Sequence, residues 1–403
     1  MSLLSVEDAL GRILTSATPP SLSELVDLHD GSARVLSQDI PALVTHPAFD
    51  NSAMDGYAVR HQDIETIGAE LTVIGQSAAG HGFKGDVKPG EAVRIFTGAP
   101  VPSGADTVII QEDTERLPGN RIRTKFVPGQ GRHIRMAGQD FTAGEAALFA
   151  GDVLDPGRLT LAAGMNHSRL PVFKRPRVAI LATGDELLVP GSEPGADQII
   201  ASNSFGVAAI ARDNGADVID LGIVGDDREA ITAQVERAQA ANIDVLVTLG
   251  GASVGDHDLV QSTLLACGMT LDFWRIAMRP GKPLMVGQLG ETIVLGLPGN
   301  PVSSLVCSLL FLEPLVRKLA RLPDRDRQAT ARLASALPAN DIRKDYVRAR
   351  LSRDDGGTLV AHPFSRQDSS MMKVFAQSDC LIVRPPYAAE SPAGTACDIL
   401  RLR

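Results

Sequence analysis

Four apolar runs with helical stretches between them constrain the fold of this chain more than any other feature. The runs lie at residues 177–184, 217–224, 243–249 and 271–277. The intervening segments, such as NSFGVAAIARDNG and DREAITAQVERAQAA, have the composition of helices. Strands that are apolar throughout and alternate with helices are typical of a parallel sheet covered on both faces. The sequence therefore predicts a parallel-sheet α/β domain, to which we assign residues 176–326.

The rest of the chain predicts three further domains, and a length of 403 residues is ample for several. Short apolar runs cut by Gly and Pro indicate a β-rich domain. Helix-like spacing both before and after that domain indicates that it is inserted into another one. The predicted domains are an inserted β-rich domain at 46–140, a discontinuous helical linker domain at 1–45 with 141–175, and a small C-terminal β domain at 327–403.

Composition excludes several classes of function. A net charge of −9 and a pI near 5.4 disfavour a nucleic-acid groove, which needs a basic face. The cysteines are too far apart for a zinc framework, and their pattern is not that of a disulfide scaffold. The first residues, MSLLSVEDALGRIL, contain acids and favour an amphipathic helix over a signal peptide. The most apolar stretch contains prolines, Asn300 and Glu313, which disfavours a membrane span. We expect a soluble, cytoplasmic protein.

Glycines and charged residues follow every predicted strand. The four runs are followed by TGDEL, GDD, GGASVGDHD and RIAMRPGKP, and a last predicted strand is followed by LPGNPVSS. Any one of them alone is explained by a turn or a helix cap. In open parallel sheets, however, ligands bind beyond the carboxyl ends of the strands. Because all five motifs fall at such ends, they predict a ligand site at one edge of the sheet.

The loop GGASVGDHD has the glycines of a phosphate loop but ends in acids instead of the usual lysine and hydroxyl. Its backbone N–H groups, with those of the helix start after Pro301, can hold phosphate oxygens. The cations that the loop lacks can come from basic residues nearby. Acids and phosphates tolerate each other when a hard divalent cation lies between them, so we expect Mg²⁺ here. The candidate phosphate-binding residues are Gly250, Gly251, Ser253, Gly255, Arg275, Arg279 and Lys282, and the candidate metal ligands are Glu186, Asp226, Asp227 and Asp258.

Long motifs extend this pattern over nearly the whole chain. They are FDNSAMDGYAV, TGAPVPSGADTVI, GQDFTAG, TGDEL, GGASVGDHD, RPGKP and LPGNPVSS. In composition and order they resemble the molybdopterin molybdenumtransferase family, which includes MoeA and the gephyrin E domain. The resemblance implies a subunit of four domains, whose sheet domain is like MogA and MoaB, and an elongated homodimer. It implies that adenylylated molybdopterin is hydrolysed, that AMP leaves, and that molybdate enters the dithiolene with Mg²⁺ present.

The resemblance also assigns roles to individual residues. It implies that Asp55 and Asp140 come from the partner subunit and complete a shared cleft, with catalytic roles beside Glu186 and Asp258, and that Thr97 lines the same cleft. Molybdate is a dianion, which suits a cluster of arginines. Its candidate site contains Arg275, Arg279, Arg348, Pro298 and Pro301, with Ser369 as a further substrate-binding residue. Which acid accepts a proton and which holds the metal is left open.

Four positions depart from the family pattern. Relatives often have lysine where this chain has Arg275 and Arg279, and arginine holds an oxyanion in a planar fork. Asp368 precedes Ser369 where many relatives have glycine, which puts an acid beside the expected oxyanion pocket. Ala201 stands where relatives commonly carry an acid or its neighbour, so Asn203 receives no role.

Two other functions compete with the transferase. The strand-end motifs also resemble the adenylyltransferase that makes the substrate, although a free-standing adenylyltransferase would not need FDNSAMDGYAV or the C-terminal domain. Relatives in animals act as membrane-receptor scaffolds, and a non-enzymatic carrier or scaffold is the third reading. For the transferase we expect transient contacts with the adenylyltransferase and with acceptor molybdoenzymes, and no nucleic-acid or membrane partner. A preference for molybdate or tungstate is not predicted.

Overall fold

The computed structural model describes residues 3–250 and 259–402. The chain folds into two compact units. One contains residues 1–24 and 173–403, and the other contains residues 25–172. Within the described residues, no helix is both long enough and apolar enough to cross a membrane.

The first unit contains the predicted α/β sheet. Its strand order is β16-β13-β17-β21-β20-β18, in which β16, β13, β17 and β21 run parallel. The strand β20 is antiparallel to both of its neighbours, so β18 points the same way as the parallel strands. The hairpin of β20 and β21 departs from the wholly parallel prediction, because only Gly290 and Glu291 separate the two strands and so short a connection makes them antiparallel. The strands are β13 (Arg177–Thr183), β16 (Asp217–Val224), β17 (Val245–Leu249), β18 (Thr270–Trp274), β20 (Met285–Leu289) and β21 (Thr292–Leu297).

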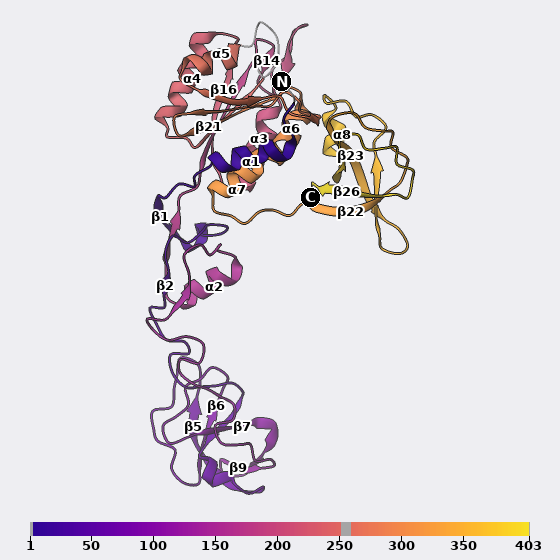
Figure 1. Ribbon diagram of the computed structural model, residues 1–403. Helices are drawn as coiled ribbons and strands as arrows, with labels where there is room; N and C mark the ends of the chain where they lie inside the picture. Colours follow the sequence, from indigo (N-terminus) through magenta and orange to yellow (C-terminus); the bar gives the residue numbers. More distant parts are fainter. Residues whose placement is uncertain (1–2, 251–258, 403) are drawn as a thin grey trace. The chain divides into compact units, whose positions relative to one another are not determined.

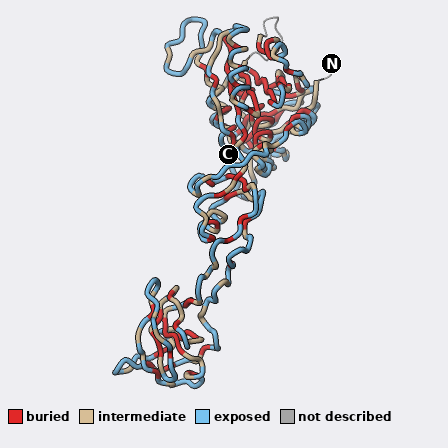
Figure 2. The backbone as a smooth tube through the Cα atoms, turned by 90° about the vertical axis from the view of Figure 1, so that its left-hand side faces the viewer, coloured by how far each residue is buried: buried red, intermediate tan, exposed pale blue. Residues whose placement is uncertain are grey.

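Helices cover both faces of this sheet (Figure 1). Along β13, Ile180 packs into one core with the first group of helices, and Leu181 packs into the opposite core with the second group. This double burial is why the strands are apolar throughout, and Figure 2 shows the buried residues gathered in this unit's interior. The first group is α1 (Val6–Ser16), α3 (Asn203–Asp213), α6 (Pro301–Cys307) and α7 (Glu313–Leu319), and the second is α4 (Arg228–Ala240) and α5 (Leu259–Ala266).

The C-terminal strands form a small closed barrel in the same unit. Their order is β23-β24-β22-β26-β25, and pairing of β23 with β25 closes it. The short strand β19 (Met278–Arg279), which belongs to the α/β body, adds to β23 in parallel. Val347 and Ala349 of β23 point into the barrel core, whereas Tyr346 packs into the core of the α/β body. The elements are β22 (Gln328–Leu333), β23 (Lys344–Arg353), β24 (Leu359–Pro363), α8 (Met372–Ala376), β25 (Cys380–Arg384) and β26 (Ala396–Arg401).

The second unit contains the β-rich segment and a smaller core. The β-rich segment forms a sheet in the order β7-β4-β6-β5-β9-β8. The smaller core joins Leu36 and Ile40 to Phe141, Leu148 and other residues up to Val172. Chain segments on both sides of the β-rich segment therefore share one core, as an insertion requires. The elements are β4 (Gly56–Val59), β5 (Glu70–Ser77), β6 (Glu91–Ile95), β7 (Thr107–Ile110), β8 (Thr114–Leu117), β9 (Arg121–Thr124), the pair β2 (Ile40–Pro41) and β11 (Ala146–Leu148), and α2 (Pro156–Gly164).

The first helix does not belong to that smaller core. Ala9 and Ile13 of α1 are fully buried against the α/β body, and Ser5 caps the helix by accepting a hydrogen bond from the N–H of Asp8. The predicted linker domain begins at residue 1, whereas the chain joins the second unit only at residue 25. Amphipathic spacing predicts that α1 is a helix but does not say which core it covers.

Candidate functional site

A cavity of about 850 Å³ lies at the edge of the sheet where the parallel strands end. Five of the predicted site residues line it together: Glu186 after β13, Asp226 after β16, Gly250 after β17, and Pro298 and Pro301 after β21. They come together because parallel strands bring their carboxyl ends to one edge.

The acidic wall of the cavity is held in place by backbone geometry. The N–H of Asp226 donates to Asp185 Oδ1 at 3.0 Å, which joins the loop after β13 to the loop after β16. Gly184 has a φ of +145°, and a Cβ there would lie 2.3 Å from Glu186 Oε2. The pKa of Asp226 is raised by partial desolvation and by the negative charges of Asp185 and Glu186. Asp185 was not among the predicted residues, although it is the first acid of TGDEL.

Asp227, another predicted metal ligand, does not line the cavity. Asp227 is the N-cap of α4, where its carboxylate accepts a hydrogen bond from the N–H of Ala230 at 2.8 Å. Asp258, together with the predicted phosphate-binding residues Gly251, Ser253 and Gly255, lies outside the described residues. In the described part of the chain, no group of three or more His, Cys, Asp or Glu residues could hold a metal ion. From the described residues, the cavity therefore offers carboxylates from Glu186 and Asp226.

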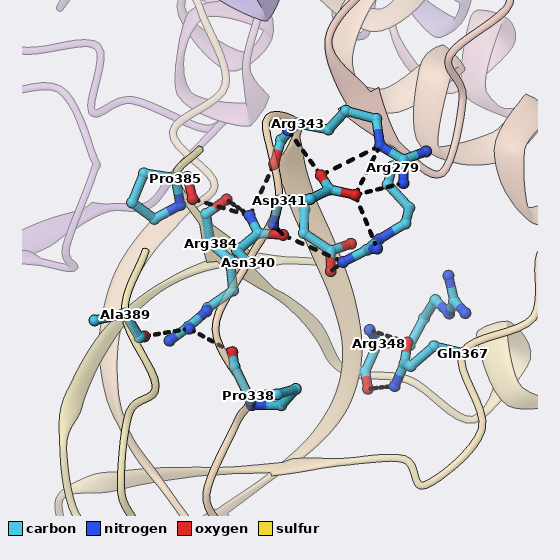
Figure 3. Close-up of polar contacts among 11 residues, drawn as sticks. Arg279, Pro338, Asn340, Asp341, Arg343, Arg348, Gln367, Arg384, Pro385 and Ala389 are labelled. Carbon is cyan, nitrogen blue, oxygen red and sulfur yellow. Dashed lines mark hydrogen bonds and ion pairs between the residues drawn. The ribbon is translucent and has the colours of Figure 1, made fainter. Parts of the chain in front are cut away.

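Arg279 is already paired with acids (Figure 3). It lies 2.5 Å from Asp345 Oδ2 and 3.5 Å from Asp341 Oδ2, and it also donates to Asn340. The hydrogen bond to Asp345 is the main cause that raises its pKa. The charge of Arg279 is therefore largely neutralised within the chain.

The two other predicted cations near this position, Arg275 and Lys282, are placed differently from Arg279. The guanidinium of Arg275 lies over the ring of Trp274, 4.0 Å from its centroid, and its backbone has a positive φ of +75°. Lys282 is exposed, and its backbone carbonyl accepts a hydrogen bond from the N–H of Ile276. Neither residue lines the cavity at the sheet edge.

Arg348 is a buried cation without a carboxylate partner among the described residues. It is 1% exposed, its Nη2 makes one long bond of 3.4 Å to the carbonyl of Asp368, and its Nε has no partner. Desolvation lowers its pKa. It faces the α/β body because it alternates along β23 with the inward-pointing Val347 and Ala349. Its backbone is fixed by paired bonds to the amide of Gln367 (Figure 3).

A segment of the barrel closes one side of the cavity. Ser370 and Met372 line the cavity, and the Ser202 hydroxyl donates to Met372 Sδ at 3.3 Å. The carbonyl of Ser369 accepts the N–H of Val302, the first free N–H of α6, at 3.0 Å. The helix start expected to hold phosphate is therefore capped by the barrel, because the carbonyl satisfies that orphan donor.

Asn203 and Ser370 line the cavity but were not among the predicted site residues. Asn203 lines the cavity and donates from Nδ2 to the carbonyl of Gly299 at 2.7 Å, which braces the loop LPGNP. Ser370 lines the cavity one residue beyond the predicted Ser369. For Asn203 the available signal was its place at the start of the predicted helical stretch NSFGVAAIARDNG. For Ser370 no signal existed, because its position depends on a turn.

The second unit holds the remaining predicted residues. The carboxylate of Asp55 accepts hydrogen bonds from both the N–H and the hydroxyl of Thr97, each at 2.8 Å. These bonds lower its pKa, so Asp55 is a fixed, ionised acid on an exposed loop. Asp140 is exposed, and its N–H donates to the carbonyl of His46.

Comparison with known proteins decides the family. Three family models match in order: the MoeA N-terminal region (domain I and II) at residues 4–165, the probable molybdopterin-binding domain at 179–318, and the MoeA C-terminal region (domain IV) at 330–402. A molybdopterin molybdenumtransferase from Haemophilus influenzae is 33% identical over 98% of both chains. The chain belongs to the MoeA family. A molybdopterin molybdenumtransferase from Nostoc is 36% identical over 90% of this chain and 85% of its own.

The fold of this MoeA family member agrees with a solved relative. The crystal structure of the molybdopterin biosynthesis MoeA protein from Pyrococcus horikosii is 29% identical and covers 100% of both chains with a TM-score of 0.83. The multidomain α/β fold expected from the sequence is thereby confirmed. The family also confirms that the chain is an enzyme of molybdenum cofactor biosynthesis, a molybdopterin molybdenumtransferase.

Proposed function

We propose that the cavity at the sheet edge binds adenylylated molybdopterin, that its phosphoanhydride is hydrolysed in a Mg²⁺-dependent reaction, and that molybdate is inserted as AMP leaves. The observation that carries this proposal is the convergence of Glu186, Asp226, Gly250 and the loop LPGNP on one cavity. Carboxylates beside a glycine turn at the ends of parallel strands suit a phosphorylated ligand that binds with a divalent cation.

The residues present fit Mg²⁺. In proteins this ion takes oxygen ligands and usually binds one or two carboxylates together with substrate phosphates. Glu186 and Asp226 supply two carboxylates, and neither makes an ion pair within residues 3–250 and 259–402. The pKa of Asp226 is raised first by partial burial and then by the negative charges of Asp185 and Glu186, and a bound cation would offset that charge. Bound there, the ion would neutralise phosphate oxygens and polarise the phosphoanhydride.

The chain's own groups position the substrate. Gly250 has a φ of +96°, and a Cβ there would lie 2.8 Å from the carbonyl of Thr183, so the strand ends in a tight glycine turn at the cavity. Asn203 braces the neighbouring loop LPGNP through its hydrogen bond to the carbonyl of Gly299, and Pro301 of that loop begins α6. Molybdate, a dianion, is proposed to bind near Arg348, whose Nε has no partner and whose charge no carboxylate pairs among the described residues.

We further propose that the active enzyme is a homodimer and that the partner copy brings Asp55 and Thr97 to the cavity. This rests on the fixed, ionised state of Asp55 on an exposed loop of the second unit. A prediction follows for mixed subunits. Glu186→Gln and Asp55→Asn homodimers should each be inactive, whereas subunits mixed in equal amounts should recover about a quarter of the wild-type activity, because half of the dimers then hold one intact site.

The control for this prediction is a mixture of Glu186→Gln with Asp226→Asn. Both changes fall on the same side of the proposed cleft, so no intact site forms and activity should stay absent. Recovery in both mixtures, or in neither, would contradict the shared cleft.

The proposed reaction is tested by AMP release from adenylylated molybdopterin with Mg²⁺, with and without molybdate. We expect AMP release that depends on both ions, with active cofactor as the product. If the protein instead adenylylates molybdopterin from ATP, that result would support the adenylyltransferase alternative. Tight binding without AMP release, where a known transferase is active, would support a carrier.

A further inference from the structure

The acid at position 368 holds a serine at the cavity. Asp368 Oδ1 accepts two hydrogen bonds from Ser370, one from its N–H at 2.8 Å and one from its hydroxyl at 2.6 Å. The carbonyl of Asp368 accepts a bond from Arg348 Nη2, and the next carbonyl, that of Ser369, accepts the N–H of Val302. The turn is therefore anchored on both sides, and Ser370 is the residue of this turn that lines the cavity.

The hydrogen bond to Asp368 settles what the Ser370 hydroxyl can offer a ligand. The pKa of Asp368 is lowered by its bonds to Ser370 and by the charge of Arg348, so the carboxylate is ionised at neutral pH. An ionised carboxylate is only an acceptor, so the proton in the 2.6 Å bond comes from Ser370. The hydroxyl oxygen then presents lone pairs to the cavity and has no proton left for an oxyanion.

The cavity surface beside Ser370 is formed by a methionine and by aliphatic side chains. Met372 lines the cavity with 50% of its surface exposed, and Ile199, 56% exposed, and Ile200 line it as well. Ile199 and Ile200 form the short strand β15, which pairs with β14 (Leu187–Leu188). A thioether and aliphatic side chains suit the face of a flat ring, and methionine sulfur makes favourable contacts with aromatic systems.

We infer that Ser370 and Met372 form a subsite for a heteroaromatic ring of the substrate, in which Ser370 accepts a hydrogen bond from a ring N–H or amino group and Asp368 acts as its positioning residue. This rests on the proposed function, because both the pterin and the adenine of adenylylated molybdopterin present such donors. The subsite gives a role to the acid at position 368: its carboxylate accepts the hydrogen bond of the Ser370 hydroxyl and so leaves the serine oxygen as an acceptor.

The test is equilibrium binding of molybdopterin and of AMP, measured separately with EDTA present, to the full-length protein. Ser370→Ala and Asp368→Ala should weaken binding of one ligand or both by about threefold to tenfold, the value of one hydrogen bond. Weaker binding of molybdopterin alone assigns the subsite to the pterin, and weaker binding of AMP alone assigns it to adenine. Asp368→Asn keeps the Oδ1 acceptor and should bind nearly as the wild type does.

Turnover separates positioning from a structural role. In both alanine variants the KM for adenylylated molybdopterin should rise while the KM for molybdate stays unchanged. Ser365→Ala is the matched control, because Ser365 is an exposed serine of the same segment that does not line the cavity, and this variant should bind both ligands normally. If the wild type binds a ligand and Ser370→Ala binds it equally tightly, the subsite is overturned but the proposed function stands. If the wild type binds neither ligand and releases no AMP, both fall.

Discussion

Replacing Arg348 with methionine should raise the KM for molybdate by about a hundredfold or more, without lowering the stability of the protein. Losing one partner of a desolvated charge pair costs about 2–5 kcal/mol of binding free energy. Arg348 is 1% exposed, has an unpartnered Nε and makes no ion pair within the described ranges. Burial of such a cation costs folding free energy, so its removal should leave the melting temperature unchanged or higher.

The matched comparison is Arg279→Met. Because Asp345 and Asp341 already neutralise Arg279, this change should alter the KM for molybdate much less. Melting is followed by the fluorescence of Trp274, the single tryptophan of the chain, which lies in the α/β body. A lower melting temperature for Arg348→Met with an unchanged KM for molybdate would show that Arg348 is structural and that molybdate binds elsewhere.

The second large effect concerns stability. Glu313→Gln should lower the free energy of unfolding by about 3–5 kcal/mol, the usual cost of breaking a buried ion pair. Both oxygens of Glu313 accept bonds of 2.7 Å from Arg327, and the side chains are 4% and 13% exposed. Arg327 also donates to the carbonyls of Arg401 and Leu402, so the pair joins α7 to the end of the barrel. Urea unfolding followed by Trp274 fluorescence measures the loss.

Two further variants make that prediction specific. Replacing both partners, as Glu313→Leu with Arg327→Met, should recover much of the lost stability, because no unpaired charge is left buried. Asp272→Asn is the exposed control: its pair with Arg12 has side chains 44% and 52% exposed, so the loss should stay within about 1 kcal/mol. Equal losses for Glu313→Gln and Asp272→Asn would contradict the argument from burial.

The parallel strands made the acidic wall predictable. Glu186, Asp226 and Gly250 each follow an apolar run directly, and the rule that such ends meet at one edge needs no knowledge of side-chain packing. The same rule placed the loop LPGNP, since β21 is also parallel. The hairpin of β20 and β21 was not predicted, because only two residues, Gly290 and Glu291, separate these strands.

The sequence could not predict that Arg279 is paired with acids whereas Arg348 is not. Arg279 and Arg348 are the same residue type in charged surroundings, and nothing local says which one is neutralised. Arg279 finds Asp345, 66 positions away, because β19 pairs with β23. Arg348 loses its solvent because β23 packs against the α/β body. Both outcomes depend on how distant segments meet, and so does the orientation of Ser370.

Backbone hydrogen bonds join the barrel to the α/β body at two places in the described part of the chain. Residues 278–279 pair with Lys344–Asp345, and the carbonyl of Ser369 accepts the N–H of Val302 at the start of α6. Loss of the barrel would keep the strand ends but would remove the cap of α6 and the cavity wall that Ser370 and Met372 form. An exchange of domains between relatives should therefore preserve the site only if the α/β body and the barrel are transferred together.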